Sequence, residues 1–159
     1  MGLFGSKEQR RFRRDLLETH NEYRTWHGAP KLKLSRKLSR SAKIYARGLA
    51  ETNKIADMRH SPEAIEGLYG ESIACASYQQ SGREASELWY TEMKRYNFET
   101  PGYQPRTSHF TAMVWRSTRK VGCGMARAED GSVYIVARYF PPGNMIEEGE
   151  YAENVWPPR

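Results

Sequence analysis

One stretch near the end of the chain constrains the fold most, because two strand-like runs meet at a tight turn between positions 121 and 140. Asp130 and Gly131, which separate the two runs, form a pair favoured in hairpin turns. The second run, VYIVARYF, is apolar enough to be a central strand and would be an aggregation hazard if it were exposed. We therefore expect an antiparallel hairpin that other elements cover.

Helical patterns precede this hairpin. Apolar residues recur at helical intervals from Phe12 to Trp26, and Gly28 and Pro30 then end that helix. A second helix is expected over 35–52, with Ser35 as its N-cap. Further expectations are an ordered loop over 53–70, a short strand over 71–78, a third helix from Ser81 to Tyr96, a short helix that begins at His109, and a loop-like tail over 141–159. The third helix should bury one stripe, made of Ala85, Leu88, Trp89 and Met93.

The chain has 159 residues, which is long enough for one domain with a substantial core and too short for two. Helices at the start, a hairpin at the end and a helix between them indicate the α+β class, with helices packed in layers on an antiparallel sheet. We assign residues 1–11 to an N-terminal basic segment and residues 12–159 to the domain. Cys75 and Cys123 are too few for a disulfide framework and lack zinc-binding spacing, so we expect buried, reduced thiols.

The first residues predict attachment to a membrane. MGLFGS fits the N-myristoylation pattern M-G-x-x-x-[ST], with Gly2 as the acylated residue and Ser6 at the hydroxyl position. The alternative interpretation is a frayed terminus. One acyl chain gives only reversible attachment, so stable attachment needs a second signal such as a basic cluster. Five cations follow directly and are predicted to contact the membrane: Lys7, Arg10, Arg11, Arg13 and Arg14.

The distribution of charge favours anionic membrane lipids as the partner and argues against a nucleic acid. Five cations and one acid, Glu8, give residues 1–14 a charge of +4, out of a formal net charge of +6 for the whole chain. Nucleic-acid-binding proteins more often spread positive charge over a groove-sized face with aromatic residues between the cations. No apolar run approaches the roughly 20 residues of a membrane helix, and the N-terminus lacks a secretory signal pattern. We therefore expect a peripheral protein on the cytoplasmic face of membranes that is not secreted.

Six short motifs occur in one order along the chain: THNEYR at 19–24, HSP at 60–62, GES at 70–72, WYTEMKRYNF at 89–98, SHFTAMVW at 108–115 and ARYFPPGN at 137–144. In order and spacing they resemble the CAP superfamily of cysteine-rich secretory, antigen and plant pathogenesis-related proteins. The acylation pattern and the lack of disulfide cysteines make the chain most similar to an intracellular, Golgi-associated branch of this superfamily. The resemblance implies a three-layer α-β-α sandwich with a central antiparallel sheet and a functional cleft.

Four residues of these motifs form the cleft that the resemblance implies, namely His60, Glu71, Glu92 and His109. His109 is expected to face His60, and the cleft to hold a divalent cation such as zinc, with the histidines as ligands and the glutamates nearby. Imidazole nitrogens suit Zn²⁺, but two protein ligands are fewer than the usual three or four, so we expect modest affinity. An alternative interpretation is that Glu92 is a buried acid satisfied by backbone donors.

The function that we expect is a non-enzymatic, membrane-associated module that binds anionic lipids or sterols, because the resemblance implies lipid binding and, in this branch, homodimers. The alternative is a hydrolase with Ser77 as nucleophile, His60 as base and Glu71 as the group that orients the base, or one that uses a metal-bound water. No GxSxG motif surrounds Ser77. A third interpretation is that the cleft residues only maintain the fold. His20 and His27 are interpreted as packing or surface residues.

Overall fold

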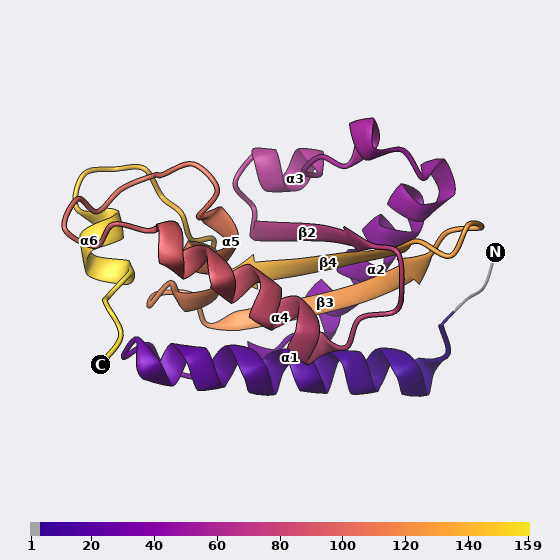
Figure 1. The fold of residues 1–159 in the computed structure, drawn as a ribbon, viewed down its shortest axis with the longest axis horizontal. Coiled ribbons are helices and arrows are strands. Elements are labelled where there is room, and N and C mark those ends of the chain that lie inside the picture. The colour runs from indigo at the N-terminus through magenta and orange to yellow at the C-terminus, as the bar shows by residue number, and fades with distance from the viewer. Residues whose placement is uncertain (1–3) are drawn as a thin grey trace.

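The computed structural model describes residues 4–159, which form helices around a four-stranded sheet (Figure 1). The α-helices are α1 (Ser6–Trp26), α2 (Arg36–Thr52), α3 (Pro62–Ile65), α4 (Gly82–Tyr90), α5 (Ser108–Val114) and α6 (Glu150–Asn154). The strands are β1 (Lys33–Leu34), β2 (Gly70–Ala76), β3 (Lys120–Arg127) and β4 (Val133–Phe140), and the 3₁₀ helices are η1 (Ile55–Asp57) and η2 (Thr91–Arg95). None of the helices in this part of the chain is long and apolar enough to cross a membrane.

The sheet has the strand order β1-β3-β4-β2. β3 and β4 form the hairpin, as predicted, and β2 pairs antiparallel with the other side of β4, which is therefore a central strand. At the turn, the N–H of Gly131 donates to the carbonyl of Ala128 at 3.0 Å, and the φ of 92° at Gly131 favours glycine. The two-residue strand β1 pairs with β3 in parallel and makes the sheet mixed. β1 was not predicted from the sequence, because two residues are too few to show a strand period.

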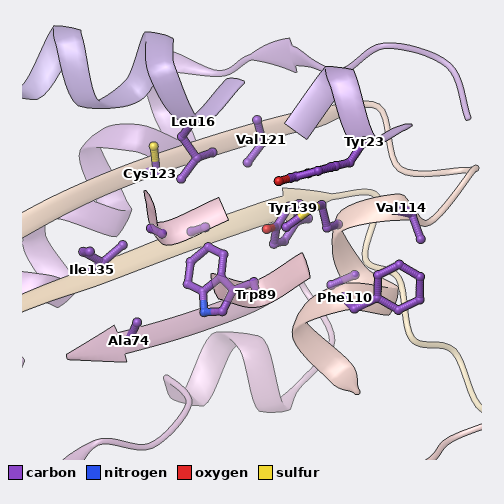
Figure 2. Close-up of a cluster of buried hydrophobic side chains, with 14 of the residues drawn as sticks. Leu16, Tyr23, Ala74, Trp89, Phe110, Val114, Val121, Cys123, Ile135 and Tyr139 are labelled. Atoms are coloured by element: carbon purple, nitrogen blue, oxygen red, sulfur yellow. The ribbon is translucent and has the colours of Figure 1, made fainter. Parts of the chain in front are cut away.

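Helices cover both faces of the sheet, which confirms the α+β class and the three-layer α-β-α sandwich (Figure 1). Alternate residues of β4 face opposite layers. Ile135 belongs to the core cluster that contains Leu16 of α1 and Phe110 of α5 (Figure 2), whereas Val136 belongs to the cluster that contains Ala46 of α2. This alternation follows from the two-residue period of a strand. β4 is therefore buried on both faces.

α2 packs directly on β3 because two glycines leave no side chain between them. A Cβ atom at Gly122 would lie 2.3 Å from the backbone nitrogen of Ser39, and one at Gly124 would lie 2.6 Å from the Cα of Lys43. Real Cβ atoms essentially never approach backbone this closely, so any larger residue would push α2 away from the sheet. The two glycines therefore fix the distance between α2 and the sheet.

Side chains of α1 and α2 cap the edge of β3 beyond the short strand β1. The N–H of Cys123 donates to Ser39 Oγ at 3.2 Å. Gln9 Nε2 donates to the carbonyl of Met125 at 2.8 Å, and the N–H of Met125 donates to Gln9 Oε1 at 3.3 Å. These bonds satisfy edge groups that would otherwise need a further strand or water. They also hold α1 and α2 on either side of one sheet edge.

α1 begins at Ser6, which is earlier than the apolar pattern that starts at Phe12. Gln9 is buried and Phe4 is 7% exposed, and the Arg127 guanidinium lies 4.5 Å from the centre of the Phe4 ring. The boundary expected after residue 11 therefore falls inside a helix that packs on the domain. The sequence did not reveal this, because the apolar stripe that marks the helix starts only at Phe12. Gly2 lies outside the described residues.

The remaining expected elements are present, but some differ in where they end, in which residues they bury and in the short helices they contain. α2 follows Ser35, whose Oγ accepts the N–H of Leu38 at 3.1 Å, so the predicted N-cap is confirmed. The third helix ends at Tyr90 and continues as η2, and Leu88, which was expected to be buried, is 52% exposed. The ordered loop over 53–70 contains η1 and α3, and the tail contains α6. Such short helices have too few turns to show a helical period.

Both cysteines are free, as predicted. Cys123 is buried, and its burial raises the pKa of its thiol to about 12. Cys75 is only half-buried, so the expectation of burial holds for Cys123 alone.

Candidate functional site

The first histidine–glutamate pair lies where α3 begins beside the sheet. His60 precedes Ser61, the N-cap of α3, and the His60 Nδ1 is 3.1 Å from Glu71 Oε1. Glu71 lies in β2 directly opposite Arg138 of β4, and Arg138 Nε donates to Glu71 Oε2 at 3.0 Å. The imidazole is 53% exposed, whereas the carboxylate is fully buried. In this pair a solvent-exposed histidine ring is therefore held by a buried carboxylate.

Four hydrogen bonds hold the Glu71 carboxylate. Besides His60 and Arg138, the backbone N–H of Ser61 donates to it at 2.8 Å and the Ser61 hydroxyl donates at 2.9 Å. Burial alone would raise the pKa of Glu71, but the bonds from His60 and Ser61 and the charge of Arg138 outweigh it and lower the pKa below its ordinary value of 4.5. Glu71 is therefore an anion near neutral pH.

The second pair lies at the start of α5. His109 Nδ1 is 2.6 Å from Glu92 Oε2, and the ring of His109 stacks on that of Trp89 with 5.7 Å between their centres. Glu92 Oε1 accepts the backbone N–H groups of His109 at 3.0 Å and of Phe110 at 3.1 Å. The N-cap residue Thr107 makes no capping bond of its own. Glu92 of η2 therefore caps α5, as the alternative interpretation of a backbone-satisfied acid predicted.

The structure pairs each predicted histidine with one predicted glutamate, His60 with Glu71 and His109 with Glu92. A cleft of about 280 Å³ opens beside His60 and Glu71, and its wall includes Ala112 of α5 but neither Glu92 nor His109. Among residues 4–159, no group of three or more His, Cys, Asp or Glu side chains is placed to hold a metal ion. In both pairs the carboxylate fixes the ring through Nδ1, and Nε2, the atom with which histidine commonly binds metal, makes no hydrogen bond to a described residue.

Ser77 lies apart from the first pair. Glu71 is near the start of β2 and Ser77 follows its far end, so at 3.3 Å per residue the two are about 20 Å apart along the strand. Ser77 is exposed. Within one chain, the structure therefore does not bring the proposed nucleophile to the His60–Glu71 pair.

Arg138 and Ser61 both bind the carboxylate of the first pair, and neither residue was predicted from the sequence to belong to the site. Arg138 is 4% exposed, and it is the single charged residue in the run VYIVARYF. A charge inside a buried strand needs a buried partner, so the sequence contained a signal for an acid near Arg138. Ser61 carried no comparable signal, because its role depends on where α3 begins.

His20 and His27 are packing residues, as interpreted. His20 Nδ1 lies 2.9 Å from Ser86 Oγ, and its Nε2 lies 2.8 Å from the hydroxyl of Tyr139. Burial, followed by the charge of Arg24, lowers the pKa of His20 to about 3, so the ring is neutral. His27 is also buried, with both ring nitrogens hydrogen-bonded.

The basic residues near the N-terminus lie on α1. Four of them are exposed and Arg13 is half-buried; we call the five together the basic face of α1, which consists of Lys7, Arg10, Arg11, Arg13 and Arg14. Within the part of the chain that the structure describes, none of the five forms an ion pair. No direct ion pair among these residues therefore neutralises the basic face.

The sequence matches that of the cysteine-rich secretory protein family, CAP, over residues 17–139. The chain belongs to the CAP family. This confirms the resemblance that the six motifs indicated. The CAP chain is 49% identical to the human Golgi-associated plant pathogenesis-related protein 1 over 155 residues, which cover 98% of this chain and 99% of the human protein.

One further relative in sequence and one solved structure are also similar to this chain. Pathogenesis-related protein 1 of Arabidopsis thaliana is 30% identical over 137 residues, which cover 86% of this chain and 81% of that protein. Among solved structures, NaASP2 with Zn²⁺ has a TM-score of 0.70 and 22% identity, covering 94% of this chain and 90% of that one. The last likeness shows the CAP fold.

Proposed function

We propose that this CAP protein is a non-enzymatic module that binds anionic lipid headgroups on the cytoplasmic face of membranes, the Golgi membrane among them. The observation that supports this most is the basic face of α1, whose cations form no ion pair within residues 4–159. The 49% identical human protein is named as Golgi-associated, which supports the Golgi membrane as a location for this chain.

The geometry of α1 favours binding to a surface. Phe12 and Leu16 bury one side of the helix in the core, so the cations on the other side project together from a fixed base. Each cation near an anionic membrane contributes about 1 kcal/mol, so the basic face contributes several kcal/mol if all of it reaches the headgroups. This attraction is electrostatic and should weaken as salt screens it.

Flotation with vesicles tests the electrostatic part of the proposal. We expect the bacterially expressed, unacylated chain to float with phosphatidylserine vesicles at low salt, to dissociate as salt rises, and to ignore neutral phosphatidylcholine vesicles. Binding that is indifferent to salt, or equal binding to both kinds of vesicle, would refute contact through the basic face.

The second part of the proposal is N-myristoylation of Gly2, which the pattern MGLFGS supports. One acyl chain provides marginal attachment, and the basic face would supply the second signal. In cells, Gly2→Ala should move the protein from the membrane fraction to the soluble fraction. A Gly5→Ala variant is the matched control, because it alters the same segment but leaves the acceptor residue and Ser6 in place. Equal membrane recovery of Gly2→Ala and the parent would exclude a role for the acyl chain.

The third part of the proposal is a divalent cation, such as zinc, at the histidine–glutamate pairs. The carboxylate on each Nδ1 fixes a ring whose Nε2 suits such an ion, and NaASP2, which shares the fold, was solved with Zn²⁺. Calorimetric titration with zinc should detect modest affinity that both His60→Ala and His109→Ala weaken. Unchanged affinity in both variants would place any bound zinc elsewhere. Sterol binding and homodimer formation stay predictions from the family resemblance.

A further inference from the structure

A second row of cations faces the basic face of α1 across a groove. The groove has a volume of about 540 Å³ and runs between α1 and α2, and Leu34 of β1 and Ser39 of α2 are among the residues that line it. Six cations line it: Arg10, Arg13 and Arg14 from α1, and Arg36, Arg40 and Lys43 from α2. The α2 residues lie more than 20 positions further along the chain, so the sequence did not associate them with the N-terminal cluster.

The groove carries no compensating charge. No Asp or Glu lines it, and none of its six cations forms an ion pair within residues 4–159. Moreover, the first turn of α2 contains no acid and begins with Arg36 and Lys37. A helix N-terminus is positive and favours acids, so cations at this position destabilise the helix. The arrangement is therefore unfavourable for the free protein and favourable for a bound anion.

The fold prevents the two rows of cations from moving apart. α2 is held on β3 by the close contacts at Gly122 and Gly124, and Ser39 binds the edge of β3 from α2. Gln9 binds the same edge from α1. Both helices are thus anchored to one strand, and the groove between them is preformed. Because the two helices are already in place, binding spends little energy on ordering the backbone.

The other side of α1 provides a contrast. A second pocket there, of about 430 Å³, is lined by Lys7 and Arg11 but also by Glu8, Asp15 and Glu84. Its two cations face three carboxylates, so it has no excess positive charge. Of these two sides of α1, both within residues 4–159, the α2-facing side concentrates cations without acids.

We propose that the groove between α1 and α2 is a binding site for a group that carries two or more phosphates. Guanidinium groups bind phosphate in two-pronged geometry, and a volume of about 540 Å³ suits a compact ligand. No aromatic side chain lines the groove for base stacking, which disfavours a nucleic acid. A polyphosphorylated lipid headgroup and a soluble polyphosphate share this chemistry. The inference rests on the proposed membrane function, since Arg10, Arg13 and Arg14 serve both.

Two charge-matched variants test the groove. The α2 variant is Arg36→Gln/Arg40→Gln/Lys43→Gln, and the remote variant is Lys54→Gln/Lys94→Gln/Arg106→Gln, which removes the same charge elsewhere. The parent should bind inorganic tripolyphosphate in calorimetric titrations at physiological ionic strength. The α2 variant should bind at least about tenfold more weakly, and the remote variant should stay within about twofold of the parent. The single variant Arg40→Gln, which should show a smaller loss of the same kind, replaces the α2 variant if that variant does not fold.

Three results would overturn the proposal. They are no binding of tripolyphosphate by the parent, equal losses in the α2 and remote variants, and binding of duplex DNA as tight as that of tripolyphosphate. The first shows no site, the second shows a response to net charge alone, and the third shows a surface for any polyanion.

Vesicles distinguish the two sources of phosphate and separate this inference from the proposed function. A parent preference for phosphatidylinositol bisphosphate over phosphatidylserine at equal surface charge, lost in the α2 variant, identifies a lipid headgroup. Tripolyphosphate binding without that preference identifies a soluble ligand. Failure of the parent to bind phosphatidylserine vesicles contradicts the membrane function, whereas the tripolyphosphate titration decides the groove by itself.

Discussion

The two histidine–glutamate pairs and the groove between α1 and α2 treat charge in opposite ways. In the pairs each acid has partners, since Glu71 binds Arg138 and Glu92 caps α5. In the groove six cations lie together and, among residues 4–159, form no ion pair. Charge with a partner stabilises the folded chain, whereas charge held without one is available to a ligand. Substitution of a paired acid should therefore lower the stability of the fold, whereas substitution of the groove cations should mainly weaken ligand binding.

The largest expected effect is loss of stability on removal of Glu71. Glu71→Ala leaves Arg138, whose side chain is 5% exposed, without its anion, so the free energy of unfolding should fall by about 3–5 kcal/mol. Glu92→Ala removes a helix cap from a carboxylate that is 14% exposed and should cost only about 1–2 kcal/mol. Urea unfolding of both variants measures the difference. A loss for Glu71→Ala no greater than that for Glu92→Ala would contradict the buried ion pair.

Removal of both partners sharpens the same point. Glu71→Leu/Arg138→Met replaces the buried pair with apolar side chains, so no charge is left unpaired. The loss in unfolding free energy of the double variant should be at least about 2 kcal/mol smaller than the sum of the losses of the two single variants. Denaturant unfolding of the full cycle gives the coupling energy. Additive losses would show that Glu71 and Arg138 act independently.

A smaller effect is expected from acid. The pKa of Glu71 is lower in the folded protein than in the unfolded chain. As pH falls, Glu71 is therefore protonated in the unfolded chain before it is protonated in the folded protein. The contribution of Glu71 is therefore fully present above its ordinary pKa of 4.5 and is lost as pH falls through the lowered folded pKa. Glu71→Gln should have a shallower decline in unfolding free energy below that pH than Glu92→Gln, as measured by urea unfolding at several pH values. Parallel declines would count against this linkage.

The smallest expected effect has the opposite sign. Arg36, Arg40 and Lys43 repel the cations of α1 and, in the part of the chain described, gain no ion pair in return. The free energy of unfolding of the α2 variant should therefore exceed that of the parent by about 0.5–1 kcal/mol at low salt. This gain in stability should shrink in high salt. Thermal unfolding at two salt concentrations detects it. A clear loss of stability would mean that these cations support the fold.

Much of the fold could be predicted because its signals are local. Ser35 and the apolar stripe after it define α2, and the pair Asp130 and Gly131 defines the hairpin. β1 could not be predicted, since two residues pair with β3 only after the whole sheet has formed. The start of α1 was missed for a similar reason, because Gln9 is buried by a tertiary bond to Met125 and not by an apolar pattern.

The site could be predicted only in part. The family motifs identified the two histidines and the two glutamates of the pairs. Which glutamate binds which histidine depends on tertiary contacts, which join Glu71 to His60 and Glu92 to His109. The separation of Ser77 from Glu71 could have been predicted, because the two stand at opposite ends of the strand expected over 71–78. The groove could not, since its two rows of cations meet only through the packing of both helices on β3.

Charge-matched variants test most directly our proposal that the basic face of α1 recruits anionic membranes. Sedimentation with phosphatidylserine vesicles should show binding by the unacylated parent and the remote variant, and a loss of at least about tenfold for Arg10→Gln/Arg11→Gln/Arg14→Gln. If that variant binds the vesicles as tightly as the remote variant, the basic face of α1 is not the membrane contact and the account is wrong.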